Sequence, residues 1–258
     1  MANFQIKLIA AAIIITAVVL SISSAWDDSI IVDEVPHIGA GYSYLTKQDM
    51  RLNPEHPPLA KDLAAVPLLF LHLKQDAFNS KMWQTDVNGQ WEFGRSLIFN
   101  SGPPGQGNDA DQIRHFAKTP MILFFILSAV LIFKWGRKLY GDTGAVIALV
   151  LFAFSSTVMA HSRFVTTDMP ATFGVLSGAY FFIKYLKNSS RKNFAFAALF
   201  FGIALLLKFS TFLLVPLFLL LAIIYGLAAD QQKIMTTLRL VFRTILIFTA
   251  GFVIIVWP

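Results

Sequence analysis

Long apolar runs dominate this chain and restrict it to folds in which most helices face lipid. A helix needs about 20 apolar residues to cross the hydrocarbon core of a bilayer. With 56% hydrophobic residues, 14% charged residues and a mean hydropathy of +0.62, the chain is too apolar for a soluble globular domain. The runs predict an all-α polytopic membrane protein with spans at about residues 6–24, 116–135, 143–160, 169–186, 194–208, 211–228 and 244–257.

The two ends of the chain each allow more than one interpretation. Lys7 precedes the first apolar run, and Ser-Ile-Ser-Ser-Ala at 21–25 resembles a signal-peptide cleavage region. The length of that run and the spans after it favour a retained anchor. The chain ends at Trp257-Pro258, directly after an apolar run. We expect residues 1–258 to be a single transmembrane domain and a piece of a longer protein, although a short complete chain could end in the same way.

The distribution of basic residues predicts the orientation in the membrane. With the N-terminus inside, the short inner segments hold 11 of the 21 basic residues. The loop at 25–118 then lies outside, with 12 of the 15 acidic residues against 8 basic ones. Cytoplasmic segments near spans are enriched in Lys and Arg, so this arrangement is the expected one.

The outer loop at 25–118 is too long for a simple connection. Asp33 and Pro36 predict the start of one helix, and Pro57-Pro58 the start of a second that continues to Leu73. The second is short for a span and fits a helix lying in the membrane interface. The second half of the loop runs from Trp83 to Asn108, and its last eight residues are rich in glycine and proline. This composition is typical of turns and predicts an irregular segment.

Two polar stretches interrupt the apolar sequence, and the predicted topology places both outside. One contains Asp33 and Glu34, and the other runs from His161 to Pro170 and contains Asp168. An Asp that precedes a helix can simply cap its N–H groups, and a Pro in the first turn fits the same explanation. Ionisable groups at a membrane boundary nevertheless favour a functional interpretation. We expect Asp33 and Asp168 to approach each other across an outer cavity.

Basic residues beside these acids are candidates for binding a phosphate. Arg163 matches phosphate geometry through paired hydrogen bonds, and Lys61 and Lys208 would add point charges at the same boundary. Alternatively, Arg163 and Lys208 only extend their charged ends to the lipid headgroups. Glu55 and His56 precede two prolines, which favours either a rigid solvated turn or a pair of ligand contacts held near the site.

Composition and residue spacing give little support for a metal site, for cysteine chemistry or for nucleic-acid binding. His37, His56 and His161 lie near acidic residues and suggest a divalent metal only weakly, because no spacing matches a standard zinc pattern; no metal ligands are assigned and the cofactor is unknown. The chain has no cysteine, which removes thiolate ligands and disulfides. The net charge of +6 lies in loops beside the spans and forms no basic stripe with aromatic residues, so nucleic acid is not an expected partner.

Four segments resemble the protein O-mannosyltransferases and the related aminoarabinose transferases, which are GT-C membrane glycosyltransferases. Asp33-Glu34 resembles the acidic motif of their first outer loop, and Asn-Pro-Glu-His-Pro-Pro-Leu-Ala-Lys at 53–61 resembles their His-Pro-Pro-Leu-x-Lys segment. Arg163 to Asp168 is similar to their Arg…Asp motif, and Gly202 to Lys208 to their Gly…Lys element. The resemblance covers nearly the whole chain in order, although relatives have more spans.

This resemblance implies a GT-C-like helix bundle that transfers a sugar from a polyprenyl-phosphate donor to a hydroxyl acceptor. The acceptor would be a protein Ser/Thr or a lipid or glycan, outside a bacterial plasma membrane. Asp33 would act as general base, and Arg163 and Lys208 would stabilise the leaving phosphate. Asp168 and Glu55 would position the sugar or acceptor or hold a metal, and the assigned substrate-binding residues are Glu34, Glu55, His56, Lys61, Arg163 and Lys208.

Two other functions fit parts of the sequence. A transporter or flippase for a lipid-linked substrate would use the same acids as ion sites, but it predicts ionisable residues in mid-span and broken helices in paired halves. The acids here lie at span boundaries and no internal repeat is found. A non-catalytic membrane scaffold would not need both Asp33 and Asp168.

Overall fold

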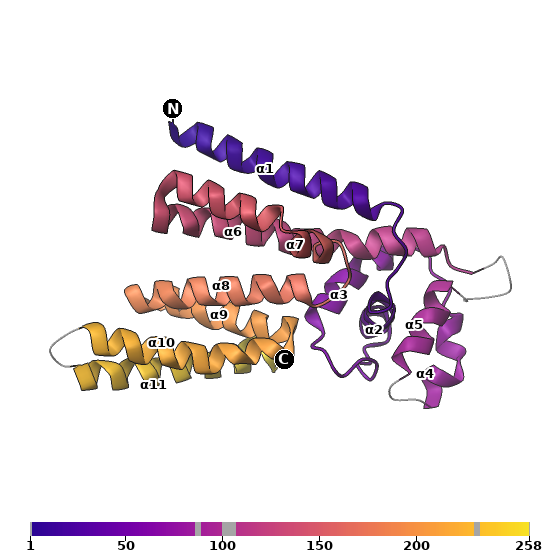
Figure 1. Cartoon of the computed structure of the whole chain (residues 1–258). Coiled ribbons are helices and arrows are strands. Elements are labelled where there is room, and N and C mark those ends of the chain that lie inside the picture. Colours follow the sequence, from indigo (N-terminus) through magenta and orange to yellow (C-terminus); the bar gives the residue numbers. More distant parts are fainter. Residues whose placement is uncertain (1, 86–88, 100–106, 230–232, 258) are drawn as a thin grey trace. The chain divides into compact units, whose positions relative to one another are not determined.

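The computed structural model describes residues 2–85, 89–99, 107–229 and 233–257 (Figure 1). Within these residues the regular structure is helical and contains no strand. This part of the chain has four helices that are long and apolar enough to cross a membrane, namely Phe4–Ala25, Ala110–Ala153, Phe209–Ala228 and Lys233–Val256. The prediction of an all-α polytopic membrane protein is confirmed.

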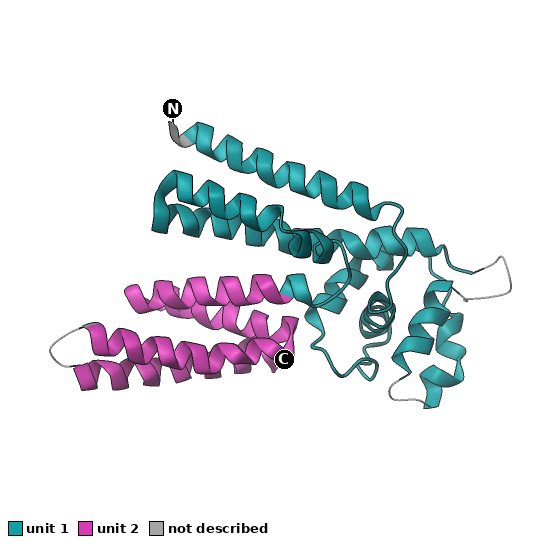
Figure 2. Cartoon of the chain, viewed as in Figure 1, with its two compact units in different colours: residues 1–170 teal, residues 171–258 magenta. Residues whose placement is uncertain are grey.

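The chain forms two compact units, Met1–Pro170 and Ala171–Pro258, which are described separately (Figure 2). The helices that lie in the first unit are α1 (Ala2–Ala25), α2 (Glu34–Lys47), α3 (Leu59–Ala65), η1 (Val66–Phe70), η2 (Asp76–Asn79), α4 (Lys81–Thr85), α5 (Gln90–Phe99), α6 (Ala110–Ala153) and α7 (Ser156–His161). Helix α8 (Asp168–Lys187) begins at the end of this unit, and the second unit continues with α9 (Arg191–Leu207), η3 (Phe209–Leu213), α10 (Leu214–Ala229), α11 (Lys233–Gly251) and η4 (Phe252–Val256).

Helix α6 is a hairpin of two helices joined at Gly141. Gly141 has φ 73° and ψ −171°, which a residue with a side chain rarely adopts and glycine adopts without steric cost. Across the bend, the rings of Phe125 and Phe152 stack with centroids 5.7 Å apart. The first arm, 110–140, contains the predicted span at 116–135. The second arm, 142–153, is shorter than the span predicted at 143–160, because the backbone leaves the helix at Phe154 and Ser155 before α7. Helix α1 packs on this hairpin through a core that includes Ala10 and Phe133.

Helix α2 is the centre of the first loop and is buried along most of its length. Two of its glycines permit close packing: a Cβ on Gly39 would lie 2.7 Å from Gly94 Cα in α5, and one on Gly41 would lie 2.2 Å from the Lys61 carbonyl oxygen in α3. Both distances are shorter than any ordinary contact, so α3 and α5 can approach α2 only because these positions lack side chains.

Two details of the first loop differ from the sequence-based expectation. The α-helix predicted to continue to Leu73 ends at Ala65 and tightens into the 3-10 turn η1, since Pro67 in its first turn lacks the N–H group that an α-helix interior needs. The irregular segment predicted from Trp83 contains helix α5. Phe93 and Leu97 recur on one face of α5 and are fully buried, so packing against α2 forms this helix. The glycine- and proline-rich residues 100–106 lie outside the described residues.

The second unit is held by aromatic packing between its helices. The rings of Phe182 in α8 and Phe218 in α10 stack with centroids 4.1 Å apart. Phe201 in α9 lies 4.7 Å from Phe248 in α11, and all four rings belong to one apolar core. Helices α8 and α9 have 20 and 17 residues and occupy the positions predicted as spans at 169–186 and 194–208.

Candidate functional site

The two polar stretches meet at Val165. The Glu34 carboxylate accepts a hydrogen bond from the Val165 N–H at 2.8 Å, and the Nδ1–H of His37 donates to the Val165 carbonyl at 2.9 Å. Glu34 and His37 lie on the first turns of α2. This helix therefore binds both the N–H and the carbonyl group of Val165, in the segment before α8. Asp33 immediately precedes Glu34, and Asp168 follows Val165 by three residues.

Asp33 and Glu34 are neighbours with opposite environments. Asp33 is exposed and precedes α2 with helical backbone angles (φ −68°, ψ −22°), and its side chain makes no capping hydrogen bond. Side-chain caps normally require an extended residue at this position. Glu34 is fully buried. Within the described part of the chain, the Asp33 carboxylate has neither a hydrogen-bond partner nor an ion-pair partner, so it is available to a ligand.

The Glu34 side chain links three segments of the chain. In addition to Val165, its carboxylate accepts the Ile31 N–H at 2.9 Å and lies 3.5 Å from Lys118 Nζ near the start of α6. Burial raises the pKa of Glu34, while the two backbone hydrogen bonds and the charge of Lys118 oppose that change. Every oxygen of this carboxylate is engaged inside the protein, which leaves little room for the substrate contact that the sequence suggests.

Asp168 begins α8 and its side chain is 46% exposed. One of its carboxylate oxygens lies 3.5 Å from Nδ1 of His161, whose side chain is 41% exposed. An acid that is accessible but has a neighbouring imidazole can accept hydrogen bonds from a hydroxylated ligand. The structure therefore leaves Asp168, like Asp33, open to solvent at the end of the unit where the two polar stretches meet.

Lys61 is enclosed rather than exposed to a ligand. Only 1% of its surface is accessible. Its Nζ lies within hydrogen-bond distance of four acceptors, the Tyr44 hydroxyl at 2.9 Å, the Asn53 carbonyl at 2.9 Å and amide oxygen at 3.0 Å, and the His56 carbonyl at 2.7 Å. Burial lowers the pKa of Lys61 to about 8. The ammonium has only three N–H groups, so Lys61 holds the loop at 53–56 and has no donor left for a phosphate.

Glu55 and His56 are carried by the loop that Lys61 holds. The Gln90 side chain donates to Glu55 Oε1 at 2.5 Å and accepts from the Asn53 amide. The His56 ring lies edge-on to the His37 ring, with centroids 5.2 Å apart. Burial lowers the pKa of His37 to about 4, so this imidazole is neutral at physiological pH. Gln90 was not identified from the sequence, because nothing in its local pattern indicates its contacts.

Two cationic side chains, the buried Lys118 and the partly exposed Arg163, share a pocket of about 140 Å³ at the end of α1 and the start of α6. Arg163 Nη1 contacts Asp28 at 2.7 Å and the Ser24 hydroxyl at 2.8 Å, while its buried Nε has no hydrogen-bond partner among the described residues. The buried Nζ of Lys118 likewise has no hydrogen-bond partner in that part of the chain. The remaining lining residues are Ile22, Ala25, Trp26, His115, Thr119 and Ile122.

Lys118 was not recognised as a candidate from the sequence. The signal was present, since Lys118 lies inside the apolar helix Ala110–Ala153, and an ionisable residue inside a span favours a functional interpretation. The sequence could not show that its partner would be Glu34, which is 84 residues away.

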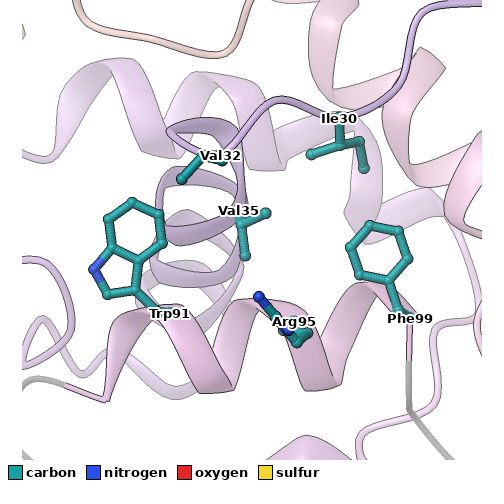
Figure 3. A pocket seen from close by; sticks show the side chains of 6 residues that line it. All are labelled: Ile30, Val32, Val35, Trp91, Arg95 and Phe99. Atoms are coloured by element: carbon teal, nitrogen blue, oxygen red, sulfur yellow. The ribbon is translucent and has the colours of Figure 1, made fainter.

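A larger groove of about 440 Å³ is lined in part by residues just before and at the start of α2 (Figure 3). Trp91, Arg95 and Phe99 recur every four residues on one face of α5 and form one wall, as expected for helical spacing. Ile30, Val32 and Val35, on either side of Asp33 in the sequence, form the opposite wall. The groove is thus largely apolar, with one guanidinium between two aromatic rings.

The remaining candidates do not join this group. Lys208 belongs to the second unit, where it ends α9 with an extended backbone (φ −160°, ψ 138°). Among the residues that the structure describes, no three His, Cys, Asp or Glu side chains gather as a metal site would require. His37, His56 and His161 therefore do not form such a cluster with the nearby acids.

Comparison with known proteins identifies one family. A family model described as dolichyl-phosphate-mannose-protein mannosyltransferase matches residues 111–257. The match includes Lys118, Arg163, Asp168 and Lys208 and begins after Asp33 and Lys61. Neither the comparison with curated proteins nor that with solved structures found a match.

Proposed function

The chain belongs to the dolichyl-phosphate-mannose-protein mannosyltransferase family, and from this we propose that it transfers a sugar from a polyprenyl-phosphate donor to a hydroxyl acceptor. Membership supports a membrane glycosyltransferase of the GT-C type. The donor, the acceptor and transfer on the outer side of a bacterial plasma membrane are parts of the proposal. The observation that supports it most directly is the pocket that Lys118 and Arg163 line, where each has a buried N–H donor without an acceptor among the described residues, beside an apolar wall.

The chemistry of this pocket fits a lipid phosphate. Each cation has a carboxylate neighbour, Glu34 for Lys118 and Asp28 for Arg163, but Lys118 Nζ and Arg163 Nε are buried without a hydrogen-bond acceptor among the described residues. A buried donor without an acceptor is costly, so the site favours an additional acceptor such as an anion. Phosphate accepts strong hydrogen bonds from both a guanidinium and an ammonium. Ile22 and other apolar residues of α1 are exposed on the same helix that lines the pocket. A prenyl chain could therefore lie along α1 while its phosphate reaches Lys118 and Arg163.

The proposed reaction combines Asp33 with the cationic residues of the pocket at the end of α1. The Asp33 carboxylate removes the proton from the acceptor hydroxyl, whose oxygen attacks the anomeric carbon of the sugar. The bond between that carbon and the phosphate oxygen breaks, and the electron pair leaves with the polyprenyl phosphate. Because the phosphate gains negative charge in this step, Arg163 and Lys118 stabilise the transition state more than the bound donor.

The acceptor is assigned to the groove of Figure 3. Val32 and Val35 line it and flank Asp33 in the sequence, so a molecule in the groove would lie beside the proposed base. Its walls are apolar except for Arg95. Asp168 and Glu55 are proposed to position hydroxyl groups of the sugar or acceptor, and His56 is carried by the same loop as Glu55. These assignments rest on placement and chemical type.

Arg163→Met is expected to raise the apparent KM for the polyprenyl-phosphate donor by roughly ten- to a hundredfold or more. Met keeps the length and apolar stem but cannot donate, and a lost charge-assisted hydrogen bond costs about 1.5–3 kcal/mol. Lys208→Met is expected to act in the same direction. Initial rates at varied donor and acceptor concentrations would measure both effects. The control is Lys81→Met, an exposed lysine on α4, and unchanged donor KM in folded Arg163 and Lys208 variants would contradict the donor site.

Single cysteines at Asn79 and Asn188 are expected to react from opposite sides of the membrane. The chain has no natural cysteine, so each variant carries one thiol, and both positions are exposed. Labelling of intact cells with a membrane-impermeant maleimide should modify Asn79→Cys before lysis and Asn188→Cys only after lysis. Labelling of Asn188→Cys in intact cells would contradict the proposed orientation.

A further inference from the structure

We propose that the second unit binds the phosphate headgroup of an anionic membrane phospholipid between α8, α9 and α11. A pocket of about 270 Å³ lies where the α8–α9 turn meets α11. Arg191 at the start of α9 and Arg243 in α11 both line it. The other lining residues are Tyr185, Ser189, Ser190, Phe194 and Leu246. None of its lining residues is a proposed catalytic residue, and the inference does not depend on the proposed function.

The second unit has almost no acidic side chain of its own to pair with these arginines. Residues 171–258 include eight basic residues and one acidic residue, Asp230, which lies outside the described residues. Within the described part, neither Arg191 nor Arg243 has a hydrogen-bond or ion-pair partner. Two guanidinium groups from different helices repel each other in a shared pocket, so an anion between them would relieve an unfavourable interaction.

Arg243 lies within a helix that is long and apolar enough to cross a membrane. It is ten residues beyond Lys233 in a candidate span, which corresponds to about 15 Å along the helix axis. An arginine inside a span usually faces a partner or a polar cavity. The pocket shows that the α8–α9 turn, with Arg191, lies beside this part of α11. The phosphate of a lipid that enters between these helices would meet both arginines.

The other lining groups fit a phospholipid better than a free anion. The Ser190 side chain accepts the Asn193 N–H at 3.3 Å and donates to no residue in the described part, so its hydroxyl hydrogen can bond to a phosphate oxygen. Phe194 and Leu246 provide apolar surface next to the arginines, and Leu246 is 41% exposed. An arginine fork recognises phosphate oxygens in pairs, and basic pockets between transmembrane helices are known to bind anionic headgroups.

The test is lipid binding to the whole purified protein by native mass spectrometry in detergent. We expect phosphatidylglycerol to bind at least tenfold more tightly than phosphatidylcholine. In the Arg191→Gln/Arg243→Gln double variant the phosphatidylglycerol dissociation constant should rise tenfold or more, with phosphatidylcholine binding unchanged. The matched control is Lys192→Gln/Arg239→Gln, which removes the same charge from the same two helices at residues that do not line the pocket, and it should keep the preference.

The outcomes separate the possible explanations. An equal loss in the control pair would show a general electrostatic attraction and would overturn the proposal, as would the absence of a preference for phosphatidylglycerol. Displacement of the lipid by millimolar inorganic phosphate alone would assign the pocket to a soluble anion and would also overturn it. If the double arginine variant does not fold, Leu246→Ala provides the test, because it keeps both charges and should still weaken phosphatidylglycerol binding severalfold.

Discussion

Asp33→Asn is expected to lower the rate of sugar transfer by about 10²- to 10⁴-fold, the loss typical of a missing general base. Asn has nearly the shape of Asp but does not take up a proton at physiological pH. Because the Asp33 side chain is exposed and makes no capping hydrogen bond with α2, the substitution removes no contact that holds the fold. Folding and donor binding should therefore stay close to those of the natural protein.

The measurement is single-turnover transfer by the whole protein in membranes, with donor binding measured separately. Asp27→Asn is the matched control, since Asp27 is another exposed acid of the same segment and has no assigned role. A control rate near that of the natural protein, together with a large loss for Asp33→Asn, supports Asp33 as the base. Normal transfer by Asp33→Asn would show that another group removes the proton.

The helical membrane architecture could be predicted because it depends on long apolar runs. Most runs predicted as spans correspond to helices or to one arm of a helical hairpin, although the last helix begins at Lys233 rather than at residue 244 and the second arm of α6 ends at Ala153 rather than at residue 160. What the sequence could not show was packing. Helix α5 forms because Phe93 and Leu97 are buried against α2, and local turn signals after it suggested an irregular segment instead. The close approach at Gly39 and Gly94 likewise depends on a partner 55 residues away.

The candidate site could be predicted as a set of residues but not as a set of roles. The sequence grouped Asp33, Glu34 and Lys61, whose charged side chains all favour a functional interpretation. Burial divides this group: Asp33 is exposed, while Glu34 and Lys61 are enclosed and their polar atoms are occupied by the protein. Adjacent positions at the start of a helix point in different directions, and the pattern of residue types does not reveal which one faces the interior.

Lys118 was not identified from the sequence for a different reason. Its position about two turns inside an apolar helix indicated a partner, but the partner lies in a segment far away in the sequence. Only the fold shows that Glu34 faces Lys118, with 3.5 Å between carboxylate and ammonium, and that Arg163 lines the same pocket. The donor site proposed here therefore combines one residue identified from the sequence with one that the fold revealed.

Glu34→Ala is expected to destabilise the protein by about 3–5 kcal/mol, the usual cost of removing one partner of a buried ion pair. Lys118 would keep a buried charge without a counter-ion, and the N–H groups of Val165 and Ile31 would lose their acceptor. Thermal unfolding in detergent, followed by tryptophan fluorescence, would measure the loss. Glu92→Ala is the control, because Glu92 is exposed on α5 and surface substitutions usually change stability by less than about 0.5 kcal/mol.

A double variant tests whether the role of Glu34 is structural or catalytic. Glu34→Ala/Lys118→Met removes the orphaned charge together with its partner, so it should lose less stability than the sum of the two single variants, since residues in contact are not additive. If the Glu34→Ala variant instead has the same unfolding temperature as the natural protein but transfers no sugar, Glu34 would be a better candidate for the base than Asp33. The expected contrast is a folded, inactive Asp33→Asn protein beside an unstable Glu34→Ala protein, because only the second acid holds α2, α6 and the segment before α8 together.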